Sequence, residues 1–383
     1  MAITITQSPQ EVTPSDNPVT WVFDSTLTAQ PNFYFLVEVQ IANPTTFATI
    51  ESHRVYPEFG SKAHFDASSI TERYAIANES NAQTLPSIKI VVTEYYGTTP
   101  IAGASVTSIE VLFWKARLKK KDFTNYNFAD YFLDTVGGVK FLTLEPRGTA
   151  KVKHEDLFYL SVLTNNNAIS VTINTYEANG TLVDNVVLTG IGSGFDLITI
   201  WCGIETLETV NGVDFTNATY YTIEVGNGVG ASEVFRIDLD ESCQYSTRSR
   251  LHWLNEIGGI DSYTFGLLTR EKFNIQSFGY ERQFGSFDST GGYAYDLKDG
   301  TVIEYLKQFS KELELTSDWM IQSVQNWLSK SLYTTPIVYL EENSELYRCK
   351  VTNTSFDKKI QETDMVFQEV VQIELESDNS VNV

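Results

Sequence analysis

The 383-residue sequence contains only three cysteines, Cys202, Cys243 and Cys349, and no two of them form a CxxC pair. This scarcity argues against a disulfide framework and against a zinc site built on paired cysteines. Because free cysteine behaves as a small apolar side chain, we expect the thiols to be buried.

Histidine is nearly as scarce, with four in the chain: His53, His64, His154 and His252. They form no HExxH motif, and only His64 and Asp66 place two metal-ligand types on one strand face. The sequence also lacks a GxSxG elbow and a Walker loop, and its glycine-rich runs lie between predicted strands, so they are interpreted as turns. We therefore expect no catalytic residue, no cofactor and no metal. Two carboxylates need only meet in space, so a glycan-degrading enzyme stays open as an alternative.

Positive charge is also in short supply, since 27 Lys and Arg face 49 Asp and Glu, a net charge of −22. Phosphate binding depends on Lys and Arg, so this balance argues against nucleic acid or an anionic membrane as the main partner. No stretch approaches the roughly 20 apolar residues of a membrane span, so we expect no membrane insertion. The first residues resemble no secretory signal, and we expect synthesis and assembly in the cytoplasm of the producing cell.

What the chain does contain is apolar and aromatic side chains, at 42% and 13% of residues, including 20 Tyr and 23 Phe. Tyr and Phe favour strands. Alternation with a period of two appears in residues 169–174, 235–240, 347–352 and 371–376, which predicts strands with one solvated face. Hairpin turns are predicted at Asn179-Gly180, Gly190–Gly194, Asn211-Gly212 and Gly226–Gly230. The sequence thus predicts a mainly β fold of tandem antiparallel β-sandwiches.

One segment has helical spacing instead. The apolar residues of 319–332 recur at intervals of three and four, and Ser317-Asp318 is typical of a helix start, which predicts an amphipathic helix over residues 317–332 packed on the last domain. Residues 301–315 fit either a strand or a helix. We predict three domains: β-sandwiches at 1–118 and 119–240, and a β-rich domain at 241–383.

Two features of the sequence are candidate contact sites for other proteins. The basic run of Lys115, Arg117, Lys119, Lys120 and Lys121 is either a charged strand end or a patch that docks on an acidic neighbour. The stretch around Gly258-Gly259 contains Trp253, Tyr263 and Phe265, which predict either a turn packed in an aromatic core or an anchor between subunits.

Several stretches resemble structural proteins of tailed bacteriophages, particularly crAss-like phages and related phages of Bacteroidota. These are HRVYPEFG (53–60) with HFDASSI (64–70) and Tyr74, FLTLEPR (141–147) with LFYLSVL (157–163), and LHWLNEIGGIDSYTF (251–265). The resemblance implies a noncatalytic virion component of the tail, head–tail connector or baseplate, and it carries no active-site residue.

The leading hypothesis is therefore a structural virion protein that forms a ring or collar through contacts with copies of itself and with other tail or connector proteins. The main alternative is a carbohydrate- or receptor-binding adhesion module, in which exposed Tyr and Trp stack on a host glycan.

Overall fold

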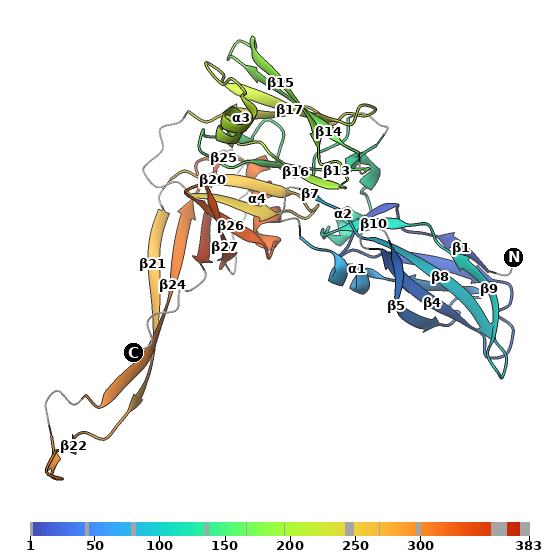
Figure 1. Cartoon of the computed structure of the whole chain (residues 1–383), viewed down its shortest axis with the longest axis horizontal. Coiled ribbons are helices and arrows are strands. Elements are labelled where there is room, and N and C mark those ends of the chain that lie inside the picture. Colours follow the sequence, from blue (N-terminus) through green and yellow to red (C-terminus); the bar gives the residue numbers. More distant parts are fainter. Residues whose placement is uncertain are drawn as a thin grey trace. The chain divides into compact units, whose positions relative to one another are not determined.

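The computed structural model describes residues 3–42, 46–77, 82–134, 138–165, 167–194, 196–241, 249–267, 269–295, 300–353 and 366–375. The chain is mainly β, as predicted, and it divides into two compact units (Figure 1). Unit 1 comprises Met1–Glu241 and Trp253–Ser262, and unit 2 comprises Ser242–His252 and Tyr263–Val383. Each unit is described separately below.

The first part of unit 1 is a sandwich of two sheets. One sheet has the order β1 (Ile3–Gln7), β3 (Thr20–Ser25), β6 (Lys62–Asp66), and α1 (Ser68–Tyr74) follows β6. The other has the order β2 (Val12–Pro14), β10 (Val111–Trp114), β8 (Ser87–Tyr96), β4 (Tyr34–Ala42), β5 (Phe47–Val55), with β9 (Ile101–Thr107) also paired to β8. Alternate residues of β3 and β4, such as Trp21, Phe23 and Phe35, are fully buried in the core between the sheets.

The second part of unit 1 is another sandwich. Its smaller sheet has the order β11 (Phe132–Leu133), β13 (Tyr159–Thr164), β16 (Leu197–Trp201), β7 (Ala82–Gln83). Its larger sheet has the order β12 (Lys151–Val152), β18 (Phe235–Leu239), β17 (Tyr220–Gly226), β14 (Ile169–Tyr176), β15 (Leu182–Ile191). Side chains of β14 alternate between buried and half-buried, which confirms the strand predicted there.

Short helical segments and a shared apolar cluster connect the two sandwiches. The helical segments are α2 (Lys120–Phe123) and η1 (Phe128–Tyr131), whereas α3 (Ile204–Asn211) lies within the second sandwich, between β16 and β17. Leu118 lies in an apolar cluster that also contains Val12 and Leu85 from the first sandwich and Leu197 from the second. Both sandwiches therefore belong to one compact unit, and their separation into domains at residues 118 and 119 stays a prediction.

Two predicted hairpin turns are wrong. Gly190–Gly194 lies at the end of β15, which pairs with β14, but the next strand, β16, belongs to the other sheet of the sandwich, so this turn joins no hairpin. The second is Asn211-Gly212. Asn211 is the last residue of α3, and Gly212 caps this helix in the left-handed region, with φ of 69°. The Gly212 N–H donates to the carbonyl of Glu208, as at many helix ends. Asn-Gly supports positive φ in hairpins and at helix ends alike, so the dipeptide alone did not distinguish the two.

Unit 2 is built on one sheet of seven strands. Its order is β20 (Ile260–Phe265), β19 (Ser249–Leu254), β26 (Val338–Glu342), β27 (Glu345–Val351), β29 (Val370–Leu375), β24 (Val302–Thr316), β21 (Thr269–Glu281). Two further strand pairs are β22 (Ser286–Phe287) with β23 (Tyr293–Ala294), and β25 (Met320–Ile321) with β28 (Val366–Phe367). Residues 301–315, which fitted either a strand or a helix, thus belong to a strand.

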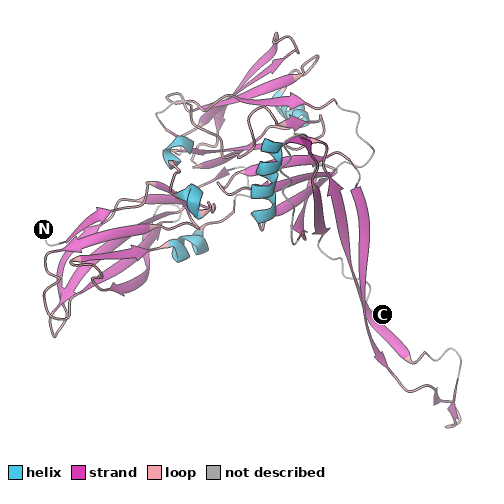
Figure 2. Cartoon of the chain, turned by 180° about the vertical axis from the view of Figure 1, so that it is seen from behind, coloured by secondary structure: helices cyan, strands magenta, loops and turns pink. Residues whose placement is uncertain are grey.

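The amphipathic helix of unit 2 is shorter than predicted. It is α4 (Gln322–Ser331), followed by the 3-10 turn η2 (Leu332–Thr334) (Figure 2). The start at residue 317 is wrong because Ser317 bonds elsewhere: its N–H donates to the Glu369 carbonyl, and its hydroxyl accepts the Glu369 N–H. The predicted apolar face is confirmed, since Val324, Trp327 and Leu328 are buried.

The two described cysteines are buried, as predicted, and Cys243 lies outside the described residues. Burial raises the pKa of Cys349 to about 12 and that of Cys202 further. Because the thiolate is the reactive form, we expect neither thiol to be alkylated by iodoacetamide at pH 8 in the native protein, and both to react after unfolding. Peptide mass spectrometry measures this, and native labelling of Cys349 as fast as in the unfolded chain would contradict it.

Candidate functional site

The most exposed part of unit 2 is a long hairpin, here called the arm, which spans residues 269–316. Its shaft consists of β21 and β24, strands of 13 and 15 residues, and β22 and β23 lie near its tip. Only residues 312–316 of β24 pair with β29, whereas β24 pairs with β21 from Val302 to Leu315. The shaft therefore continues beyond the sheet as a two-stranded ribbon (Figures 1 and 2).

The charges on the shaft are neutralised within it. Lys272 and Glu312 lie 3.0 Å apart across the strands, and Lys311 and Glu271 lie 2.8 Å apart on the other face. Such exposed pairs contribute little to stability, but they cancel the local charge. Residues 269–316 contain six basic and eight acidic residues, so the arm carries only −2 of the total charge of −22.

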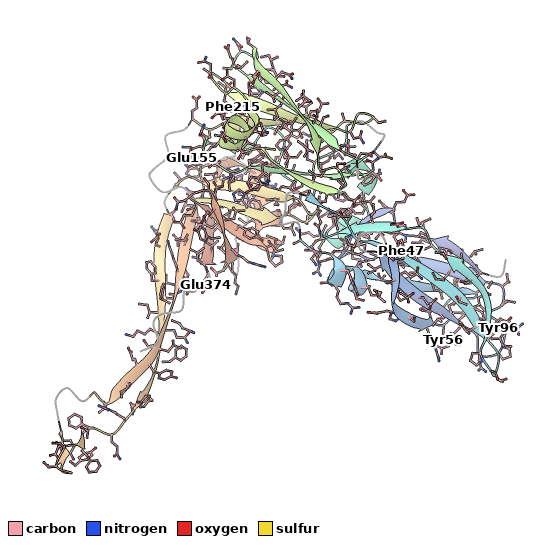
Figure 3. All side chains as sticks on the ribbon, in the orientation of Figure 1. Phe47, Tyr56, Tyr96, Glu155, Phe215 and Glu374 are labelled. Carbon is pink, nitrogen blue, oxygen red and sulfur yellow. The ribbon has the colours of Figure 1, made fainter. Side chains whose placement is uncertain are left out.

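Apolar side chains on the shaft face solvent. Directly paired residues share a face of the ribbon, so Ile275 and Phe309 form one apolar patch with the neighbouring Phe273. Their exposed fractions are 69%, 38% and 56%. Tyr280 and Tyr305 form a second pair further out, with ring centroids 6.5 Å apart. Figure 3 shows side chains projecting from the ribbon of the arm along its length. Exposed apolar patches of this kind mark interaction sites.

Four aromatic rings gather at the tip of the arm: Phe284, Phe287, Tyr293 and Tyr295. Phe284 and Tyr295 are stacked, with ring centroids 5.4 Å apart, and Tyr293 packs edge-on against Tyr295. The Tyr293 hydroxyl donates to the carbonyl of Phe284 at 3.0 Å, which positions the ring. All four rings are more than two fifths exposed, so they present a ready stacking surface.

The turn between β22 and β23 depends on one carboxylate. Asp288 accepts hydrogen bonds from the N–H and hydroxyl of Thr290 and from the N–H of Gly292, and these bonds hold the pKa of Asp288 below its usual range. A lowered folded-state pKa means that the carboxylate stabilises the turn at neutral pH, and that this stabilisation is lost as pH falls through the lowered value. We expect the Asp288 carboxyl to titrate below an unstructured aspartate in NMR, with the Gly292 amide shift following it. An unshifted midpoint would contradict this turn.

Of the predicted aromatic residues, Trp253 and Phe265 have no exposed surface and pack inside the chain. Tyr263 is half-buried in unit 2, with its ring edge-on to Phe265 at 5.1 Å and to Trp327 at 6.2 Å. The aromatic core predicted around this turn thus includes Trp253 and Phe265, and Tyr263 keeps part of its surface exposed. A role of the three residues as an anchor between subunits stays a prediction.

The turn after Trp253 is part of unit 1 and packs against its earlier residues. Asn255 donates to the carbonyl of Leu142 at 2.9 Å and to the carboxylate of Asp261 at 2.9 Å. The Trp114 indole N–H donates to the carbonyl of Ile257 at 2.8 Å. Gly258 lies against the Trp114 side chain and the Lys115 carbonyl, and Gly259 lies against the Leu142 carbonyl, which explains why two glycines stand at this turn.

The basic run is part of the folded surface of unit 1. Lys115 pairs with Asp16 at 2.9 Å and Lys119 with Glu256 at 3.8 Å, while the intervening Leu118 is buried. The remaining basic residues, Arg117, Lys120 and Lys121, are exposed. A docking role for this run stays a prediction.

The structure places His64 2.9 Å from Glu58, and Asp66 accepts the N–H groups of Val19 and Ser68. Within the described ranges, no three His, Cys, Asp or Glu side chains gather as metal ligands. No helix in the described part of the chain is both long and apolar enough to span a membrane.

Sequence reasoning missed the arm. Its apolar residues alternate with polar ones over 303–315, but the same pattern also fits a helix with one apolar face. The signal that could have found it is the absence of proline from 269–316 together with two aromatic-rich runs of similar length, which are typical of a long hairpin.

No protein-family model and no curated protein matches the sequence. Among solved structures, the chain aligns with trypsin-activated alpha-2-macroglobulin from Escherichia coli at 8% identity and a TM-score of 0.22. The alignment covers 98% of this chain and 24% of that one, so the chain spans about a quarter of that protein's length.

Proposed function

We propose that the protein is a noncatalytic structural component of a phage virion, of the tail, head–tail connector or baseplate type, which assembles through repeated contacts between identical copies. The observation that supports this most directly is the arm, which extends past its sheet with exposed apolar side chains and a nearly cancelled charge. The resemblance of three sequence regions to phage structural proteins gives the biological setting.

The rest of the chain suits such a role. Its sandwiches bury large aromatic cores, which makes rigid building blocks, and most of its negative charge lies outside the arm. That charge keeps free subunits soluble, while the neutral arm adds little repulsion when copies approach. Virion proteins made in a host cell need both properties.

Electron microscopy of the purified protein and of phage particles tests this function. We expect closed rings of copies in the purified sample, and antibody labelling of the particle at the tail or neck. A protein that stays monomeric at high concentration and is absent from particles would overturn the proposal. A mixture of the protein with an unrelated acidic β-sandwich protein of similar size serves as the control for nonspecific clustering.

A second function is favoured by the tip. Stacked Phe284 and Tyr295 present an exposed aromatic surface of the kind that binds sugar rings, so a carbohydrate- or receptor-binding adhesion module is the alternative. A glycan array distinguishes the two, because this function requires binding that is lost in a Phe284→Ser/Tyr295→Ser variant. An array with no bound glycan would count against it.

A further inference from the structure

Beyond its sheet, the arm has a hydrogen-bonding edge on each side. Residues 270–281 of β21 lie at the end of the sheet, and residues 302–311 of β24 pair only with β21 among the strands of the described ranges. A ribbon of two strands is marginally stable in water, and open edges are templates for another strand. The shaft thus has the geometry of a sheet that is completed by a partner.

The arm has few of the features by which proteins protect open edges. Prolines are absent from residues 269–316, and the lysines of the shaft, Lys272, Lys307 and Lys311, are held in ion pairs within the arm. In the described pairing of β21 with β24, the one irregularity is a bulge at Phe278 and Gly279. Edges that must stay unpaired usually have unpaired charges or prolines, so these edges are suited to pairing.

The partner that fits both edges is the arm of a second copy. In neighbouring copies related by a rotation, with arms pointing the same way, β21 of one copy lies antiparallel to β24 of the next. The β21 edge of each copy then lies beside the β24 edge of the next copy. The apolar side chains of adjacent arms lie side by side and form one continuous apolar surface. Because the shaft cancels its own charge, such an approach is not opposed by the acidity of the chain.

We propose that the outer edge of β21 in one copy pairs antiparallel with residues 302–311 of β24 in the next copy, so that the arms form a continuous intermolecular sheet. This inference rests on the proposed function, since it requires assembly of identical copies. It deepens that function by assigning the contact to two named edges that differ from one another.

The hydrogen bonding of the arm identifies residues that test each edge separately. The Arg282 N–H donates to the Thr301 carbonyl at 2.8 Å, so Arg282 directs its N–H group into the arm, and the next residues inward, Glu281 and Val302, lie directly opposite one another. In an antiparallel ladder the direction alternates along each strand. The adjacent Glu281 and Val302 therefore direct their N–H groups outward, one on each edge.

Proline at either position removes one outward donor and leaves the bonds within the arm intact. Glu281→Pro alters the β21 edge, and Val302→Pro alters the β24 edge. Glu281→Thr and Val302→Thr are matched controls, because threonine keeps the N–H and favours strands. Melting temperature and circular dichroism establish that each variant is folded.

Analytical ultracentrifugation of the full chain then measures association. We expect each proline variant alone to associate at least about tenfold more weakly than wild type, and each threonine control to remain close to wild type. A mixture of the two proline variants is expected to form 1:1 pairs, because the intact β21 edge of one meets the intact β24 edge of the other. These pairs should not grow into larger assemblies.

Three outcomes would overturn the inference. Loss of association in Glu281→Pro alone would indicate symmetric pairing of two β21 edges. Unchanged association in both proline variants would exclude the arm edges while leaving self-assembly, and hence the proposed function, in place. A wild-type protein that never associates, even at high concentration, would remove the proposed function together with this inference.

Discussion

Removal of the shaft beyond the sheet is expected to abolish self-association while leaving the melting temperature of the protein almost unchanged. The variant replaces residues 274–310 with a short turn containing Asn-Gly, which keeps the Arg270–Glu314 and Lys311–Glu271 pairs. The removed apolar side chains are mostly exposed, so their loss costs the core little. They supply most of the exposed apolar surface of the arm, so we expect the dissociation constant between copies to rise roughly 100-fold or more.

A second variant separates the shaft from the tip. Replacement of residues 283–300 by Asn-Gly closes the hairpin at Arg282 and Thr301, which are already joined by a hydrogen bond. If the shaft mediates assembly, this variant still associates, and only the longer deletion fails. Association that survives the longer deletion would show that the arm is not the contact.

Gly259→Ala is expected to be the most damaging single methyl substitution in unit 1. A Cβ at this position would lie 1.8 Å from the carbonyl oxygen of Leu142, closer than real contacts allow. The neighbouring atom is main chain and cannot rotate away. The turn must therefore move, which breaks the Asn255 bonds to Leu142 and Asp261. We expect a loss of about 3 kcal/mol or more in the free energy of unfolding.

The matched control is Gly300→Ala, whose added Cβ would meet only the Val302 carbonyl at 3.5 Å, an ordinary contact. Urea unfolding monitored by tryptophan fluorescence measures both variants. We expect the control to stay within about 0.5 kcal/mol of wild type, as exposed substitutions usually do. Equal stability of both variants would show that the turn does not pack against Leu142 as described.

The sequence predicted strands such as β14 well because these strands have one buried and one solvated face. In β14, Ile169, Val171 and Ile173 are buried while their neighbours are half-exposed, so burial follows the printed alternation. The same holds for Val371 and Ile373 in β29, whereas Glu376 of that predicted strand lies outside the described residues. Local periodicity is sufficient to predict a strand when buried and solvated side chains alternate along that strand.

The sequence did not predict the local structure correctly where that structure is determined by a contact with residues far away in the chain. Ser317 has the chemistry of a helix cap, but its N–H and hydroxyl bond to the main chain of Glu369, more than fifty residues away, and residues 317–321 stay outside the helix. Residues 301–315 of the arm fit both a strand and a helix for a different reason. Phe309 and the apolar residues beside it face solvent, because this part of the shaft packs against no core. The alternation of apolar and polar residues in the sequence is therefore not matched by an alternation of buried and exposed side chains.

The short strand β7 limits how unit 1 forms during synthesis. Ala82 and Gln83 precede the last strands of the first sandwich, yet they pair with Ile198 and Leu197 at the edge of the second. The adjoining Leu85 N–H donates to the carboxylate of Asp196 at 2.9 Å. A ribosome must therefore add more than a hundred residues before this segment reaches its partners, so the link between the first and second sandwiches is completed late, after each has begun to fold on its own.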